Sequence, residues 1–244
     1  MTAELEVCGL TKCFGGLTAS HQLSFRIGRG EIYGVIGPNG AGKTTLFAML
    51  VGALRPTRGE IYFCGERIDG KSVHPIARRG LVRTHQIVRP FRDMTVYDNV
   101  LVGASFGRPL AAGPRSVGIE EILEFTGLEK KARTLAGHLT IGELKRLEMA
   151  RALAARPRVL CLDEVMGGLN PVEIQETTAL IRRSRDQGIT ILMIEHHVKA
   201  VAEISDRIMV LNFGHKIGEG VAREVLADAR VIEAYLGDTV VPRA

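Results

Sequence analysis

A glycine-rich stretch near the start of the chain has the residue types and spacing of a phosphate-binding loop. It matches the pattern G-x-x-x-x-G-K-[ST] at every fixed position and reads Gly37, Pro38, Asn39, Gly40, Ala41, Gly42, Lys43, Thr44 and Thr45. The glycines let backbone N–H groups close around an oxyanion, because a Cβ would obstruct that approach. Lys43 can reach the terminal phosphates of a nucleotide, and the Thr44 hydroxyl can ligate Mg²⁺. The stretch therefore predicts a nucleoside-triphosphate site, since a plain turn would leave the lysine and both threonines unexplained.

The segments on either side supply the elements that such a loop needs. Residues 31–36 form a short apolar run of strand length, and residues 46–50 have the composition of a buried helix. The order of strand, glycine loop and helix is the context in which this pattern binds phosphate. The helix also directs its positive end at the bound anion.

Other predicted strands end in polar residues that can face the same crevice. In an open α/β sheet, groups at the carboxyl ends of the strands line the ligand site. Asp163 and Glu164 end the apolar run 158–164; the first can hold Mg²⁺ through its water shell, and the second can polarise an attacking water. Residues 190–194 lead to His196, which we interpret as a hydrogen-bond donor to the γ-phosphate rather than a solvated surface histidine.

Two further features have more than one interpretation. Phe14 precedes a Gly-Gly pair, and it can either stack on a purine or fill the core at a strand end. Thr140 and Glu143 have the spacing of a capping box at the start of a helix that begins within residues 139–143. That helix start can also be a second anion site, because its first N–H groups are free, and both interpretations can hold together.

Composition limits the classes of protein. With 244 residues, 45% hydrophobic and 24% charged, the chain can bury one large core, alone or with an inserted lobe. No apolar stretch approaches the roughly 18 residues that cross a bilayer, and the N-terminus lacks the features of a secretory signal. Any work at a membrane is therefore expected to need a partner. The net charge of +5 comes from scattered arginines with few aromatic residues, so no nucleic-acid partner is expected.

The order of elements predicts a single unit over residues 1–244, with an α/β core (1–87 and 151–244) and a helical subdomain (88–150). The cysteines lack metal-site spacing and are expected to be reduced and buried: Cys8, Cys13, Cys64 and Cys161. The other expected elements are strands at 5–8, 23–27, 61–64, 81–86 and 207–211, helices at 74–80, 119–125 and 221–236, a helix start at Thr95–Asp98, a loop at 103–118 and a hairpin around 212–214.

Taken in order, these motifs resemble the ATP-binding subunit of ABC transporters along nearly the whole chain. Within that superfamily the sequence most resembles the subunits that serve branched-chain amino-acid uptake. The resemblance lies in residues 14–19, 83–86, 91–96 and 168–171. Related urea, amide and lipopolysaccharide-export subunits share parts of these strings. The resemblance implies a P-loop NTPase (RecA-like) α/β core with an antiparallel β flank and an inserted α-helical subdomain.

The resemblance also implies a role for each matching residue. Phe14 would stack on adenine, residues 37–45 would hold the phosphates, and Gln86 would contact Mg²⁺ or the attacking water. Asp163 would support Mg²⁺, Glu164 would be the general base, and His196 would sense the γ-phosphate. Thr140, Gly142 and Glu143 would contact ATP held by the opposite subunit of a head-to-tail dimer. Residues 89–92 would lie against a coupling helix of the membrane subunit.

The chain departs from the usual family pattern at several of these positions. Ile141 and Glu143 differ from the common Leu-Ser-Gly-Gly-Gln signature, and Val165 stands where a proline usually follows the Asp-Glu pair. A carboxylate at position 143 would repel a triphosphate unless it points away or caps its helix. We therefore expect binding to be retained and the rate of hydrolysis to be the property most affected.

The expected protein is a peripheral ATPase at the cytoplasmic face of the inner (plasma) membrane. Its expected partners are transmembrane permease subunits, a second ATP-binding subunit (a copy or a paralogue) and, indirectly, a periplasmic solute-binding protein. The expected cargo is branched-chain amino acids or related small polar solutes. The alternatives are a soluble ABC-type ATPase acting on nucleic acid or ribosomes, and a regulatory ATP-binding subunit with weak hydrolysis. A small-molecule kinase is the least favoured, because no second substrate pocket is readable.

Overall fold

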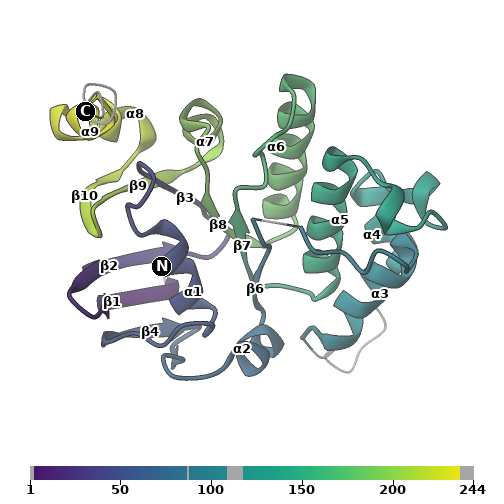
Figure 1. Ribbon diagram of the computed structural model, residues 1–244, viewed down its shortest axis with the longest axis horizontal. Coiled ribbons are helices and arrows are strands. Elements are labelled where there is room, and N and C mark those ends of the chain that lie inside the picture. Colours follow the sequence, from purple (N-terminus) through teal and green to yellow (C-terminus); the bar gives the residue numbers. More distant parts are fainter. Residues whose placement is uncertain (1–2, 87, 109–117, 237–244) are drawn as a thin grey trace.

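A six-stranded sheet forms the centre of the molecule (Figure 1). The computed structural model describes residues 3–86, 88–108 and 118–236. Strands β9, β3, β8, β7 and β6 run parallel in that order, and β10 pairs antiparallel with β9 at one edge. Their bounds are β3 Ile32–Ile36, β6 Leu81–Arg83, β7 Val159–Asp163, β8 Thr190–Ile194, β9 Arg207–Asn212 and β10 His215–Gly220.

A second, antiparallel sheet lies beside the first, in the order β2-β1-β4-β5. It consists of β1 Ala3–Phe14, β2 Leu17–Gly28, β4 Arg58–Phe63 and β5 Glu66–Arg67. This is the antiparallel flank that the sequence predicts. Strands β1 and β2 are far longer than expected, because register shifts between them let pairing continue beyond the segments with regular alternation.

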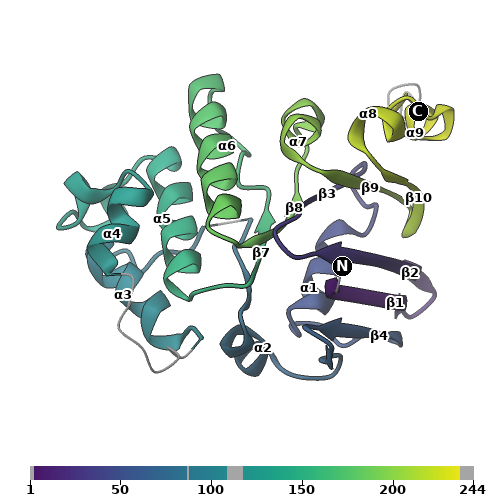
Figure 2. The same cartoon turned by 180° about the vertical axis from the view of Figure 1, so that it is seen from behind.

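The helices lie around the central sheet, and three of them form a group of their own. Helices α3, α4 and α5 lie together at one side of the central sheet, in the part of the chain expected to be helical (Figures 1 and 2). Helix α5 continues four residues past the expected boundary at residue 150. The bounds are α1 Lys43–Leu50, α2 Val73–Arg79, α3 Val96–Phe106, α4 Ile119–Phe125, η1 Glu129–Lys131, η2 Ala136–His138, α5 Ile141–Ala154, α6 Pro171–Asp186, α7 Val198–Ile204, α8 Ala222–Val225 and α9 Ala229–Leu236.

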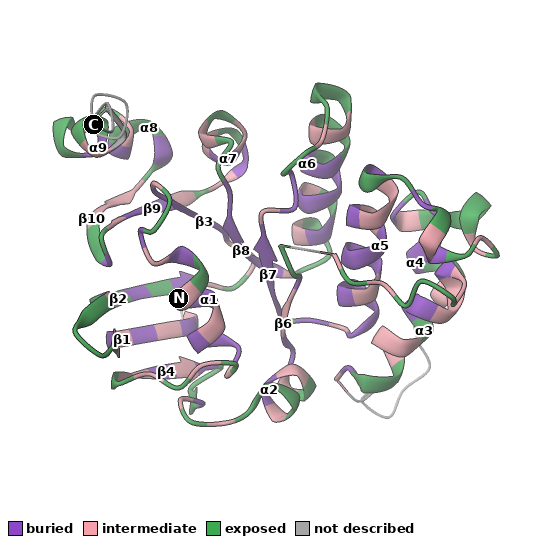
Figure 3. Ribbon diagram, viewed as in Figure 1, coloured by how far each residue is buried: buried purple, intermediate pink, exposed green. Residues whose placement is uncertain are grey.

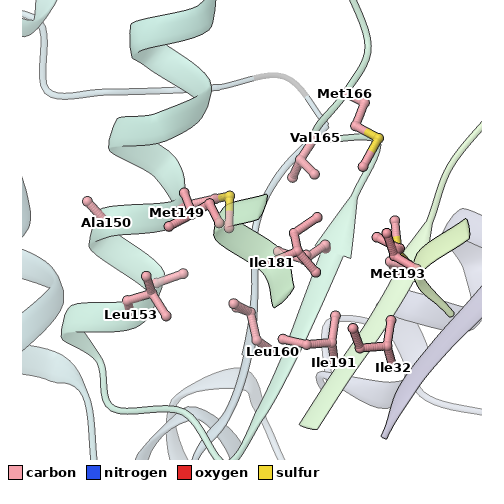
Figure 4. Packing of buried hydrophobic residues seen from close by; sticks show 14 of the residues in the cluster. Ile32, Met149, Ala150, Leu153, Leu160, Val165, Met166, Ile181, Ile191 and Met193 are labelled. Atoms are coloured by element: carbon pink, nitrogen blue, oxygen red, sulfur yellow. The ribbon is translucent and has the colours of Figure 1, made fainter. Parts of the chain in front are cut away.

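The central strands are buried on both faces, which separates two hydrophobic cores (Figure 3). In β7, Leu160 and Leu162 pack against the helices α5, α6 and α7, whereas Val159 and Cys161 face α1 and the antiparallel sheet. Figure 4 shows the first core, in which Met149 and Leu153 from α5 lie close to Leu160. The central sheet is therefore the middle layer of three, and its carboxyl edge remains free for a site.

Several local predictions are confirmed. Thr95 caps α3 by accepting a hydrogen bond from the Asp98 N–H, and the hairpin at 212–214 turns through Phe213 and Gly214, both at positive φ. Other predictions are wrong. Helix α3 continues to Phe106 where a loop was expected; residues 109–117 of that loop lie outside the described residues.

All four cysteines are free thiols, as expected, but burial was predicted correctly only for Cys161. Cys64 is exposed, because it follows the last residue of β4 in a turn at φ 51°. Among the helices of the described residues, none has the length and apolar character required to span a bilayer.

Candidate functional site

The phosphate loop joins the end of β3 to the start of α1 and is packed tightly between two other strands. Gly42 caps α1 at φ 98°, and a Cβ there would lie 2.2 Å from the carbonyl oxygen of Ala19 in β2. A Cβ on Gly37 would lie 2.1 Å from the carbonyl oxygen of Leu211 in β9. Only glycine fits at these two positions, so the sequence dictates the shape of the loop.

Lys43 is buried with its ammonium group turned into the loop. Its Nζ donates to the carbonyl oxygens of Gly37 at 2.6 Å and Pro38 at 2.9 Å. Burial lowers the pKa of Lys43, while the charges of Glu164 and Asp163 oppose that shift. A phosphate oxygen is a stronger partner for the ammonium group than a carbonyl, so an incoming triphosphate can take over these bonds.

A cavity of about 380 Å³ opens over the loop and collects side chains from distant parts of the chain. Phe14, expected either at a purine or in the core, lines this cavity and is 47% exposed, which rules out the core interpretation. The remaining lining residues are Leu17, Ala19, Asn39, Gly40, Ala41, Gly42, Lys43, Thr44, Thr45, Gln86, Glu164 and His196.

The side chains of Gln86 and His196 converge on the carboxylate of Glu164. Gln86 Nε2 donates to Glu164 Oε2 at 2.5 Å, and His196 Nε2 lies 2.5 Å from Glu164 Oε1. Since an ionised carboxylate only accepts hydrogen bonds, His196 must carry its proton on Nε2 for this contact. Both oxygens of Glu164 are therefore engaged, and each keeps a further lone pair with which it can accept from a water.

The backbone around these residues differs from the predicted strands. β7 ends at Asp163, and Glu164 follows it at φ 49°, a left-handed conformation that is uncommon outside glycine. β6 ends at Arg83 rather than Gln86. Its continuation is held to β7 because the Thr84 hydroxyl accepts from the Asp163 N–H at 3.1 Å. This register brings Gln86 beside Glu164, although Gln86 lies beyond the end of β6.

Asp163 does not line the cavity, and one of its carboxylate oxygens has no partner in the described residues. The side chain is fully buried, and its Oδ2 accepts from Arg83 Nη2 at 2.5 Å. Its Oδ1 is buried and has no hydrogen-bond partner in the described residues. Such an orphaned acceptor is costly unless a donor or a cation satisfies it. Together with the Thr44 hydroxyl and the Gln86 amide that line the cavity, Asp163 offers the oxygen ligands that Mg²⁺ prefers.

Thr140, Gly142 and Glu143 do not line this cavity. They form the start of α5, where the Thr140 hydroxyl accepts from the Glu143 N–H and Glu143 Oε2 accepts from the Thr140 N–H at 2.9 Å. This is the predicted capping box. The bond from Thr140 and an ion pair with Lys131 at 3.2 Å hold the pKa of Glu143 below its ordinary value. The carboxylate therefore turns back on its own helix, which is the arrangement that reduces repulsion of a triphosphate.

Three charged residues near the site could not be identified as site residues from the sequence. Arg83 pairs with Asp163, Lys145 is a buried lysine of α5, and Glu195 is a buried carboxylate after β8. The sequence shows only that Arg83 and Glu195 adjoin apolar runs and that Lys145 lies among other charged residues, which does not identify a partner for any of them.

A glycine-lined phosphate loop between a parallel strand and a helix, with a glutamate just after the end of another strand of the same sheet, is the site of a P-loop NTPase. The family model described as "ABC transporter" matches residues 20–167, and the chain belongs to that family. A second model, "Branched-chain amino acid ATP-binding cassette transporter", matches residues 215–241. The predicted resemblance, fold class and ATPase activity are thereby confirmed.

Individual relatives cover nearly the whole chain. The high-affinity branched-chain amino acid transport ATP-binding protein BraF of Pseudomonas aeruginosa is 41% identical, over 96% of this chain and 98% of BraF. The lipopolysaccharide export system ATP-binding protein LptB of Escherichia coli K12 is 34% identical, over 97% and 98%. The ADP conformation of MJ1267, an ATP-binding cassette of an ABC transporter, superposes with a TM-score of 0.87 at 31% identity, over 97% and 100% of the two chains.

Proposed function

We propose that this ATPase powers an importer of branched-chain amino acids or related small polar solutes. The proposal is supported by the 41% identity to BraF and by the match of residues 215–241 to the branched-chain amino-acid model. Because the chain is also 34% identical to LptB, a test must distinguish amino-acid import from export of a lipid-like cargo.

In the proposed mechanism, Phe14 offers its exposed ring to adenine, and the loop N–H groups and Lys43 bind the phosphates. Thr44, Gln86 and Asp163 would hold Mg²⁺, which neutralises charge on the β- and γ-phosphate oxygens when bound. Glu164 orients and deprotonates the attacking water, and His196 donates to the γ-phosphate. The observation that carries this assignment is the convergence of Gln86 and His196 on Glu164 over the phosphate loop.

The proposed active form is a head-to-tail pair, with a second copy or a paralogue as the other subunit. Thr140 and Ile141 are exposed at the start of α5, and they do not line the chain's own cavity. An exposed helix start has free N–H groups for the phosphates of ATP held by the partner. Glu143 would support this contact indirectly as the cap of the helix, whereas Gly142 is buried and a Cβ there would lie 2.4 Å from Glu173 Oε1.

The proposed partners are permease subunits at the cytoplasmic face of the inner membrane, which in turn receive solute from a periplasmic binding protein. Residues 89–92 are proposed to lie against the permease. No role at nucleic acid is proposed, because the basic excess is small and dispersed.

The test is to purify the chain together with the membrane proteins that co-purify with it. The complex is reconstituted in lipid vesicles, and solute uptake into the vesicles is measured. We expect ATP-dependent accumulation of labelled leucine or a related amino acid, which the Glu164→Gln chain does not support. Co-purification with a lipopolysaccharide-exporting permease, and no amino-acid uptake, would contradict the proposal. ATP turnover equal to that of the Glu164→Gln chain would instead indicate a regulatory ATP-binding subunit.

A further inference from the structure

Lys145 is a buried cation that nothing in the proposed mechanism uses. It lies in the second turn of α5, and only 8% of its surface is exposed. Its Nζ donates to the backbone carbonyl oxygens of Gln86 at 3.1 Å and Glu164 at 2.9 Å. Among the described residues it forms no ion pair, although buried lysines are usually paired. The two carbonyls that it joins belong to the two residues whose side chains meet at the site.

Two more side chains on the same face of α5 form hydrogen bonds with the segment that contains Gln86. Glu148 Oε1 accepts from the His85 N–H at 3.1 Å. Arg151 Nη1 donates to the carbonyl oxygen of Arg89 at 3.2 Å. Because Lys145, Glu148 and Arg151 are spaced by three residues, they share one side of the helix. Helix α5 therefore fixes the backbone before, at and after Gln86.

The conformation of Glu164 needs such external support. Its positive φ of 49° persists only where the surroundings determine it. The Glu164 N–H donates to the carbonyl oxygen of Ile194 at 2.9 Å, and the Glu164 carbonyl oxygen accepts from Lys145 and from the Gly167 N–H at 3.2 Å. Lys145 is the one side chain among these contacts, and it comes from another part of the fold.

We propose that Lys145 is a positioning residue for hydrolysis, which ties the carbonyls of Gln86 and Glu164 together so that their side chains meet at the attacking water. The inference rests on the proposed role of Glu164 as general base. It also couples the start of α5, which is proposed to face ATP in the paired subunit, to Gln86 and Glu164. Movement of α5 on pairing would then be transmitted through Lys145 to the hydrolytic group.

The test compares Lys145→Met, which removes the donors, with Lys145→Arg, which keeps donors for both carbonyls. Arg182→Met is the matched control, because Arg182 lies on α6 in an exposed ion pair with Glu203. We expect Lys145→Met to lower kcat at least tenfold while the Kd for ADP, measured by calorimetry, stays within threefold of the parent. Lys145→Arg should have a kcat within threefold of the parent's. Arg182→Met should have the same kcat as the parent.

Parent-like kcat in Lys145→Met would overturn the inference, and so would equal losses of kcat and ADP affinity, which indicate a general structural role. If the Met variant does not fold, Lys145→Gln decides the question: its side chain is one atom shorter and carries no charge, so it weakens the contacts with both carbonyls. A kcat at least threefold lower with ADP binding retained supports the inference, and a parent-like kcat contradicts it. If the parent shows no turnover, or Glu164→Gln turns over normally, the proposed function itself fails.

Discussion

Arg83 and Asp163 form a largely buried ion pair that engages one carboxylate oxygen of Asp163 and leaves the other, Oδ1, without a partner. The Arg83 Nη2 to Asp163 Oδ2 distance is 2.5 Å, and the two side chains are 13% and 0% exposed. The pair holds the orientation of the carboxylate, and the buried, unpaired Oδ1 is the atom assigned to the proposed Mg²⁺ contact.

Replacement of Arg83 by methionine is expected to destabilise the fold substantially. It leaves the buried carboxylate of Asp163 without its counter-charge, and breaking one half of a buried pair costs about 3 kcal/mol. The free energy of unfolding in urea measures this cost. Arg26→Met is the matched control: its pair with Glu6 is exposed, with Arg26 73% accessible, so a loss below about 1 kcal/mol is expected. Equal effects of the two substitutions would contradict the structural role of Arg83.

Two glycines of the phosphate loop are expected to respond differently to alanine. Both Gly40 and Gly42 have positive φ, so each substitution carries conformational strain. A Cβ on Gly42 also meets the Ala19 carbonyl oxygen at 2.2 Å, whereas one on Gly40 meets nothing within 4 Å. Without nucleotide, Gly42→Ala should therefore be at least about 1 kcal/mol less stable than Gly40→Ala in urea. Equal stabilities would show that the loop is not clamped against β2.

Stability is expected to depend on the titration of Glu195. Burial raises its pKa from 4.5 to about 7, so the folded state favours the protonated carboxyl. The unfolded chain releases this proton near pH 4.5, and the contribution of Glu195 to stability therefore falls as the pH rises from about 4.5 to about 7 and is constant above that. Glu195→Gln keeps the acceptor for the Met166 N–H, which lies 2.7 Å from Oε1 in the parent.

Compared with the parent, Glu195→Gln should gain up to about 3 kcal/mol of stability at pH 8 and little at pH 4.5. Urea unfolding of both chains at pH 4.5, 6, 7 and 8 measures the difference. A difference that is the same at all four values would show that Glu195 ionises at its ordinary pKa in the folded state.

The parts of the site that could be predicted from the sequence are those with local causes. Gly42 and Lys43 occur in a spacing that only a phosphate loop explains, and the Thr140–Glu143 cap follows from a three-residue spacing on one helix. Glu164 could be placed at a strand end because the apolar run before it marks a buried strand.

The rest depends on pairing between distant segments. The bond between Arg83 and Asp163 follows from the register of β6 against β7, and Lys145 reaches Gln86 only because α5 packs beside that register. A single charged residue in a strand or a helix contains no information about which carbonyl or carboxylate it meets. The extra length of β1 and β2 was missed for a similar reason, since register shifts preserve pairing where the alternation is lost.

The central claim is that Glu164, on which Gln86 and His196 converge over the phosphate loop, is the general base for ATP hydrolysis. It is tested most directly by measuring phosphate release and ATP affinity for the parent and for Glu164→Gln under the same conditions with Mg²⁺ supplied. We predict that Glu164→Gln binds ATP as tightly as the parent but releases phosphate at least 100-fold more slowly, in the range expected for loss of a general base. Equal rates of phosphate release from the two chains would contradict the account.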